Sequence, residues 1–209
     1  MRGLRPGSRK RTTARDPDAP ARPDLAGRRF CPPVPATVPC GDMTYLRTGG
    51  GRPCPAAAVG LATRMVAGRR FSARMAAGVR VAAPGMAKGR GHVAGSAVSH
   101  SGRGSRCTSA GPAGRAAADD VGLSAGRTGR CRDNAVAESL RASLENEMHC
   151  RTSFAARGEA KTARTDWIER CCNRRRPRSA VGYRHPAEPM EEFEERAARA
   201  FADEVSLAA

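Results

Sequence analysis

Large apolar side chains are scarce in this chain. Its 209 residues include one Trp, two Tyr and five Phe, and no aromatic residue occurs between Phe71 and Phe154. Ile168 is the single isoleucine, and Ile, Leu, Val and Phe together number 26, about 12% of the chain. Highly charged chains with less than roughly 20% of these residues tend to stay disordered. The composition therefore predicts a marginally stable core in which alanine replaces larger side chains.

The spacings of metal-binding and disulfide-rich proteins are also missing. None of the eight cysteines forms a C-x-x-C pair, and the four histidines form no H-x₃₋₅-H pair, although structural zinc sites use such spacings. No uncharged run approaches the roughly 18 residues that a membrane span needs, and no apolar signal-peptide segment follows the basic N-terminus. These absences argue against zinc, membrane and secreted proteins and predict a cytoplasmic location.

Positive charge dominates what the chain does contain. Lys and Arg number 37 against 20 Asp and Glu, a net charge of +17, which indicates a polyanionic partner, usually nucleic acid. A nucleoid-associated location would fit this charge. For the N-terminal arm, the Arg and Ala enrichment of a GC-rich genome explains the composition equally well.

The charge is unevenly distributed along the chain. Residues 1–41 carry nine basic against three acidic residues, residues 42–185 carry 26 against ten, and residues 186–209 carry two against seven. We therefore expect a basic, Arg/Pro-rich disordered arm over 1–36, a core domain over 37–185 and an acidic amphipathic helix over 186–209.

Three short runs stand at a defined spacing. Asp42 lies in Gly41-Asp42-Met43-Thr44-Tyr45, Gly102 lies in His100-Ser101-Gly102-Arg103-Gly104-Ser105, and Glu138 lies in Asp133-Asn134-Ala135-Val136-Ala137-Glu138-Ser139. Gly102 and Glu138 are separated by 35 residues. With Asn173-Arg174-Arg175-Arg176-Pro177-Arg178-Ser179 farther on, these runs resemble the integrase-type catalytic core of bacterial insertion-sequence transposases, the second-frame products of two-frame elements, which are related to retroviral integrases.

The resemblance implies an α/β, ribonuclease-H-like integrase core, a mixed sheet flanked by helices. The family cleaves and joins DNA with two Mg²⁺ or Mn²⁺ ions held by three carboxylates. Asp42 and Glu138 are then the expected catalytic and metal-binding residues, but the family's second Asp is replaced by Gly102. Because glycine offers no ligand oxygen, the resemblance implies an impaired enzyme. The expected DNA-binding residues are all arginines: Arg103, Arg174, Arg175, Arg176 and Arg178.

The resemblance also suggests partners and a history. DNA is the expected partner, together with further copies of the chain or the element's first-frame helix-turn-helix protein. The family's helix-turn-helix region would lie upstream of Met1, which predicts a chain truncated at its start. Where the family has Lys or Arg seven residues after the catalytic Glu, this chain has Glu145, which predicts a weaker contact with the DNA backbone.

Decay offers an alternative to a working transposase. Gly102 in place of Asp, and Cys54, Cys107 and Cys172 in place of the family's usual Tyr, are each reachable by one A-to-G transition. Two other functional hypotheses therefore stay open. One is a non-catalytic, basic nucleic-acid-binding protein that persists through charge alone, and the other is a translated pseudogene remnant.

The strands and helices expected from the sequence are those of an integrase-type core. Strands are expected near 37–46, 54–60, 65–70 and 92–99, with a helix near 73–83. Pro53 and Pro55 predict an interrupted second strand and a poorly formed N-terminal half, because proline cannot donate to a ladder. Apolar residues four apart predict a helix over 134–148, and apolar residues that recur on one helical face predict helices over 154–172 and 189–205.

Overall fold

A single mixed sheet organises the molecule. The computed structural model describes residues 23–27, 30–34, 39–43, 46, 48–73, 77–93, 97–101, 118, 120–126, 135–149 and 151–207. Five strands lie in the spatial order β3-β2-β1-β4-β5: β1 (Pro39–Met43), β2 (Cys54–Gly60), β3 (Val66–Ser72), β4 (Ala97–Ser101) and β5 (Val121–Ala125). The first three form an antiparallel meander, whereas β4 runs parallel to β1 and β5 parallel to β4. The expected α/β architecture is confirmed.

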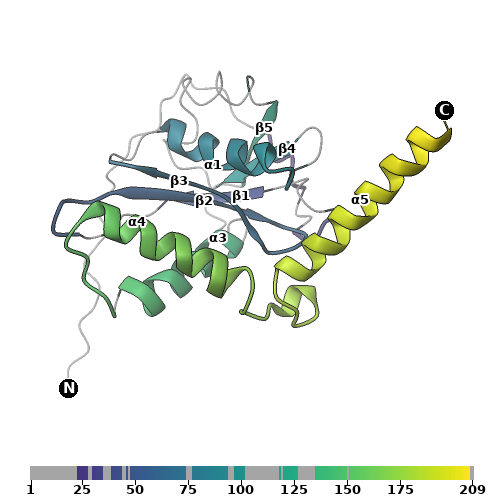
Figure 1. Cartoon of the computed structure of the whole chain (residues 1–209). Helices are drawn as coiled ribbons and strands as arrows, with labels where there is room; N and C mark the ends of the chain where they lie inside the picture. Colours follow the sequence, from purple (N-terminus) through teal and green to yellow (C-terminus); the bar gives the residue numbers. More distant parts are fainter. Residues whose placement is uncertain are drawn as a thin grey trace.

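Helices cover both faces of the sheet (Figure 1). On one face lies α1 (Ala77–Gly89), and on the other lie α3 (Ala135–Leu144) and α4 (Arg157–Asp166). Each of the latter two continues into a π-helical segment, Glu145–His149 and Trp167–Cys172 respectively. Successive side chains of a strand point to opposite faces, so alternate residues of β2 pack either against α1 or against α3 and the Trp167–Cys172 segment.

The second strand forms despite its prolines. It spans the expected Cys54–Gly60 and pairs with β3 from Cys54 to Val59. Pro53 precedes the strand and Pro55 is its second residue, opposite Phe71 of β3. Proline is disfavoured mainly in the interior of a strand, where it removes a ladder hydrogen bond. The interruption expected at Pro53 and Pro55 is therefore wrong for β2.

Other elements differ from expectation mainly in their boundaries. The helix expected near 73–83 begins at Ala77 and continues to Gly89 with Pro84 inside it. The strand expected near 92–99 is Ala97–Ser101, and β5 was not expected from the sequence. The three helices predicted in the C-terminal half are confirmed, with a π-helical ending in two of them.

Small side chains fill the interior. Among the described residues, alanine accounts for 12 of the 27 buried hydrophobic residues, as the composition predicted. Helix α1 compensates by lying very close to β3. A Cβ atom added at Gly68 would overlap the carbonyl oxygen of Ala83 and lie 2.9 Å from the backbone nitrogen of Ala87. Close backbone approach therefore replaces side-chain volume at this contact.

The C-terminal helix α5 (Ala187–Leu207) extends away from the body (Figure 1). Its apolar stripe begins at Met190, which is buried, but Phe201 and Val205 are 69% and 53% exposed. The stripe expected from the sequence is therefore packed only near its start. In the part of the chain that the structure describes, no helix is long and apolar enough to cross a membrane.

Candidate active site and nucleic-acid interface

The expected site begins where β1 and β4 end. The backbone of Asp42 pairs with Ala57 of β2, and Ala57 is buried against Leu140 of α3. Strand β4 runs parallel to β1, with Cys40 opposite His100, and ends at Ser101. The carboxyl ends of neighbouring parallel strands form one edge of a sheet, where α/β proteins commonly place their sites. Gly102 and Arg103, which follow β4 in the sequence, lie outside the described residues.

Helix α3 carries Glu138 onto the same strands. Glu138 lies in the first turn of the helix, and its side chain is half-buried. On either side of it, Ala137 is buried with Leu61, and Leu140 is buried with Val59. These contacts hold α3 against β1 and β2. The structure therefore packs the helix of Glu138 against the strand of Asp42.

A buried polar cluster supports the end of β4. His100 is almost fully buried, and its Nδ1 lies 2.8 Å from the hydroxyl of Ser124 on β5. That hydroxyl also accepts the backbone N–H of Leu25 at 2.9 Å, and the Asp24 carboxylate lies 3.8 Å from His100 Nδ1. The ring of Phe30 meets the imidazole edge-on at 6.2 Å. Sequence reasoning missed this role, although His100 belongs to the run that contains Gly102.

The donor set does not suit a two-ion centre. Asp42 and Glu138 can offer the hard carboxylate oxygens that Mg²⁺ prefers, but Gly102 offers none. Within the described residues, no three His, Cys, Asp or Glu side chains gather as a metal site. Two-metal strand transfer requires ligands that hold both ions about 3.5–4 Å apart. Of the three carboxylates that the family resemblance implies, the chain has Asp42 and Glu138 and carries Gly102 in place of the other.

Glu145 has a close basic neighbour. It begins the π-helical segment that continues α3, and its Oε1 lies 3.9 Å from Nε of Arg141, one turn earlier. Both side chains are nearly half exposed. Exposed helical pairs of this kind contribute only about 0.3–0.5 kcal/mol, so the pairing with Arg141 is weak.

The side chain of Asn173 bonds the arginine-rich run Arg174–Arg178 to strand β3. Only 1% of this residue is exposed. Its Oδ1 accepts the Val66 backbone N–H at 2.9 Å, and its Nδ2 donates to the Val66 carbonyl at 3.3 Å. Because β3 is an edge strand, the amide satisfies backbone groups that have no neighbouring strand. The carbonyl oxygen of Asn173 in turn accepts the N–H of Ala187 at the start of α5.

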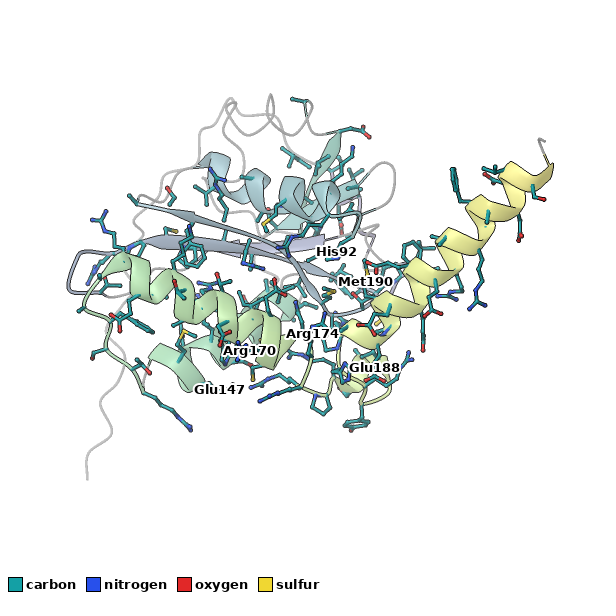
Figure 2. The ribbon with its side chains drawn as sticks, in the orientation of Figure 1. His92, Glu147, Arg170, Arg174, Glu188 and Met190 are labelled. Carbon is teal, nitrogen blue, oxygen red and sulfur yellow. The ribbon has the colours of Figure 1, made fainter. Side chains whose placement is uncertain are left out.

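The four arginines that follow differ in their environments. Arg174 and Arg175 are exposed, and Arg174 lies near the start of α5, with Nη1 3.6 Å from the Glu191 carboxylate (Figure 2). Arg176 pairs with Glu147, and its Nη1 lies 3.4 Å from the Ser143 hydroxyl. Arg178 is partly buried. The structure therefore presents two of the four at the surface and turns the other two toward the protein.

Two titratable groups nearby are strongly influenced by their surroundings. Burial alone would raise the pKa of Glu169, but the hydrogen bonds and charges of Arg69 and Arg90 outweigh it, so that the pKa lies below its ordinary value. Burial raises the pKa of the Cys172 thiol to about 12. Glu169 is therefore an ionised anchor for two arginines, and Cys172 behaves as an apolar core residue.

Comparison with known proteins identifies the family. Residues 119–186 match the model of the integrase core domain. The 31 kDa protein of insertion element IS600 from Shigella sonnei is 30% identical over 189 residues, which cover 90% of this chain and 69% of that protein. The transposase for insertion sequence element IS904 from Lactococcus lactis is 29% identical over 166 residues, 79% of this chain and 66% of that protein. The chain belongs to the integrase-core family of insertion-sequence transposases.

The matched region of this integrase-core protein includes Glu138 and the Arg174–Arg178 run but begins after Asp42 and Gly102. A protein of insertion sequence element IS986/IS6110 from Mycobacterium tuberculosis is 32% identical over 154 residues, 71% of this chain and 55% of that protein. The chain thus spans about half the length of this curated relative.

Solved structures confirm the integrase-core fold. The catalytic core domain of BIV integrase aligns with a TM-score of 0.56 and 15% identity, over 78% of this chain and 99% of that one. The HTLV-2 integrase catalytic core domain, solved with magnesium in a trimeric form, aligns with a TM-score of 0.54 and 10% identity, over 75% and 97% of the two chains. At these identities the likeness establishes the fold alone.

Proposed function

We propose that this chain is a DNA-binding integrase-core protein of an insertion sequence in which DNA cleavage and strand transfer are impaired. One observation carries the proposal. In an integrase fold, the strand of Asp42 packs against the helix of Glu138, while the sequence has Gly102 directly after β4. We infer the ancestral reaction from the family's role in transposition and the impairment from the missing carboxylate.

The impairment follows from charge as well as from ligand number. Gly102 contributes neither an oxygen nor a negative charge. Water can fill a ligand position on Mg²⁺ but cannot replace the lost charge. A loss of several kcal/mol of transition-state stabilisation corresponds to at least about a thousandfold in rate. Asp42 and Glu138 then remain as the two metal-binding candidates.

DNA binding is proposed to survive this loss. The chain carries a net charge of +17, and Arg174 and Arg175 are exposed on a segment that Asn173 holds against β3. Arg103 belongs to the same proposal on sequence grounds. Such binding would neutralise phosphates without reading base sequence, and would associate the protein with the nucleoid. Self-association and pairing with the element's helix-turn-helix protein are further proposals of the family resemblance.

The catalytic half is tested by strand transfer. Purified chain incubated with donor ends and Mg²⁺ or Mn²⁺ should give no joined product, because the second carboxylate is absent. Gly102→Asp should raise divalent-ion affinity and restore product, and adding Asp42→Asn should abolish it again. Robust joining by the parent chain that is lost in Asp42→Asn would overturn the proposed impairment.

The DNA-binding half is tested by salt titration of labelled duplex. The double variant Arg174→Ala/Arg175→Ala should reduce the slope of log affinity against log salt by about 0.9 for each phosphate that the protein no longer neutralises. Arg151→Ala removes an exposed arginine elsewhere and serves as the single-charge control. Equal slopes for the parent and the double variant would remove these two arginines from the interface.

The outward face of α3 is tested by charge reversal. Glu145→Lys should tighten DNA binding and steepen the salt slope by about one unit. Glu204→Lys makes the same charge change on exposed α5 and should have the smaller effect. If the two variants behave alike, only net charge matters, and the Glu145 face does not meet DNA.

A further inference from the structure

The start of helix α5 lies beside the arginine-rich run. The backbone N–H of Ala187 donates to the Asn173 carbonyl at 2.9 Å, and both Ala187 and Met190 are buried. In Figure 2, Arg174 lies near this buried end of the helix. The first turns of α5 are therefore held against the body by backbone and apolar contacts, whatever their charged side chains contribute.

Acidic side chains gather in these same turns. Five of the seven acidic residues of α5 lie between positions 188 and 195. Four of the five contact basic side chains outside the helix: Glu188 with His185 at 3.0 Å, Glu191 with Arg174 at 3.6 Å, Glu192 with Arg184 at 2.6 Å and Glu194 with His92 at 3.6 Å. The negative charge of α5 is thus placed next to basic groups of the body.

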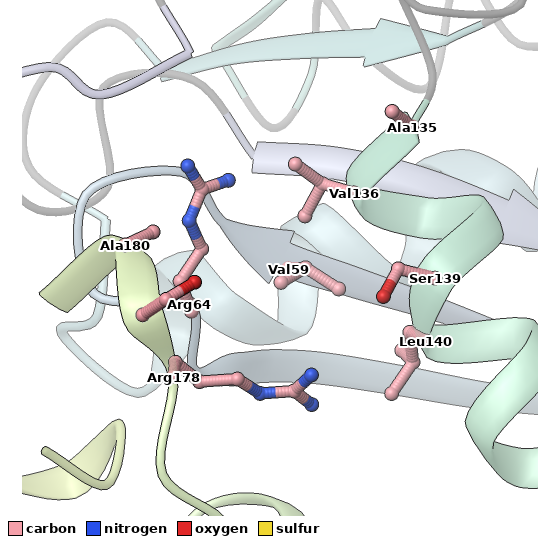
Figure 3. A pocket seen from close by; sticks show the side chains of 9 residues that line it. Val59, Arg64, Ala135, Val136, Ser139, Leu140, Arg178 and Ala180 are labelled. Carbon is pink, nitrogen blue, oxygen red and sulfur yellow. The ribbon is translucent and has the colours of Figure 1, made fainter. Parts of the chain in front are cut away.

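One of these basic groups belongs to the proposed DNA interface. In the arginine-rich run, Arg174 and Arg175 are the exposed members, whereas Arg178 lines a pocket beside α3 and extends toward Leu140 (Figure 3). Glu191 faces the first of the two exposed arginines. Within the described part of the chain, no carboxylate lies at salt-bridge distance from Arg175. The two neighbouring arginines therefore differ, because a carboxylate of α5 accompanies only Arg174.

A carboxylate at this distance opposes the binding of phosphate to the same guanidinium. A phosphate oxygen on Arg174 would lie within about one Debye length of Glu191, roughly 8 Å at physiological ionic strength, so the two anions would repel each other. Exposed ion pairs are individually weak, but the buried start of α5 keeps this carboxylate beside the arginine. Groups held within one molecule act at a high effective concentration. DNA thus meets a competitor that cannot diffuse away.

We propose that the acidic start of α5 is an autoinhibitory contact that lowers the affinity of this chain for DNA. Glu191 occupies Arg174 in the free protein, and DNA must take this arginine from the carboxylate. Glu192 acts in the same way on Arg184, which lies beside the run because its carbonyl accepts the N–H of Arg178. The inference rests on the proposed DNA binding and adds a contact that restrains it.

Salt titration of labelled duplex with variants of the full chain tests this contact. Glu191→Gln removes one charge, keeps the size of the side chain and leaves Arg174 to a phosphate. It should steepen the slope of log affinity against log salt by about 0.9, so that its gain over the parent is about three- to fourfold larger at about 50 mM than at about 200 mM salt. Glu204→Gln makes the same charge change near the exposed end of α5 and should have a smaller effect.

Combination with arginine variants separates the autoinhibitory contact from the DNA interface. Arg174→Ala should reduce the salt slope more in the Glu191→Gln chain than in the parent, because the carboxylate no longer competes there, whereas Arg175→Ala should reduce the slope equally in both chains. An equal reduction by Arg174→Ala in both chains would leave its DNA contact intact and overturn the autoinhibition, as would equal effects of Glu191→Gln and Glu204→Gln. If Arg174→Ala reduced the slope in neither chain, this arginine would not meet DNA, and its place in the proposed interface would fall together with the autoinhibitory contact.

Discussion

Replacing Asn173 by alanine should destabilise this protein more than most polar substitutions would. The side chain makes two hydrogen bonds to the backbone of Val66 and a third, at 3.4 Å, to Glu169. It belongs to the arginine-rich run yet faces the sheet. Asn173→Ala would leave both the N–H and the carbonyl of Val66 without a partner at a buried position.

The magnitude follows from these groups. Each buried donor or acceptor left unsatisfied costs about 1–3 kcal/mol. Water can reach part of an edge strand, which places the sum near the lower half of the range, about 2–4 kcal/mol. Domains of this size are stable by only about 5–15 kcal/mol, and an alanine-rich interior favours the low end. The variant should therefore lose a large fraction of its stability.

Urea unfolding followed by far-UV circular dichroism measures the effect. The midpoint for Asn173→Ala should fall while the slope with denaturant stays close to that of the parent chain, as expected when stability alone changes. Asn146→Ala removes an exposed amide from the segment after α3 and should change the free energy of unfolding by less than about 0.5 kcal/mol. If Asn173→Ala changed the free energy of unfolding as little as Asn146→Ala, the hydrogen bonds between Asn173 and Val66 would contribute nothing to stability, and the reasoning would fail.

Three further predictions concern thiols, pH and packing. Because burial raises the pKa of Cys172 to about 12, its thiol should resist alkylation by iodoacetamide at pH 8 in the native chain, whereas exposed Cys31 should react. Mass spectrometry of native and urea-treated samples measures the extent of alkylation at each cysteine. The arginine partners of Glu169 lower its pKa, so the stability that its ion pairs contribute is present above the ordinary carboxyl pKa and is lost as pH falls through the lowered value. The loss of unfolding free energy in Glu169→Gln should therefore shrink on acidification. A loss that stays constant with pH would contradict the ion pairs. Gly68→Ala should lower the melting temperature through overlap with α1, whereas Gly158→Ala, in open space on α4, should raise stability by up to about 1 kcal/mol; the opposite order would refute the close approach.

The order of the helices in the C-terminal half could be predicted well because the spacing of apolar residues along the sequence indicates it. The i+4 pattern in residues 134–148 specified a helix and its buried face, and Leu140, Leu144 and Met148 are indeed buried. Strand β5 was not anticipated, because Val-Gly-Leu-Ser-Ala is short and contains glycine and alanine, which are depleted in strands. The proline argument failed because Pro53 precedes β2 and Pro55 is only its second residue, and the sequence does not reveal where a strand begins.

The candidate site was predictable only where a motif pointed to it. The family resemblance pointed to Asp42 and Glu138, and the structure packs the strand of the first against the helix of the second. The arginines of the 174–178 run were predicted as one group, but their burial divides them, since exposure depends on how Asn173 orients the segment. Arg64 and Arg178, which line one pocket beside α3, are 114 positions apart, and no periodicity in the sequence relates them.

The short distance between α1 and β3 has a consequence for how this interior can change. At Gly68 the helix backbone already occupies the space that a methyl group would need, so extra volume at this contact requires the whole helix to move outward. Insertion of methylenes into a filled interior typically costs about 1–3 kcal/mol. Enlargement of one side chain would therefore be unfavourable until its neighbours on α1 changed as well, and substitutions that interact in this way are not additive. Evolution toward a bulkier interior would thus proceed through sets of mutually dependent mutations, each harmful alone.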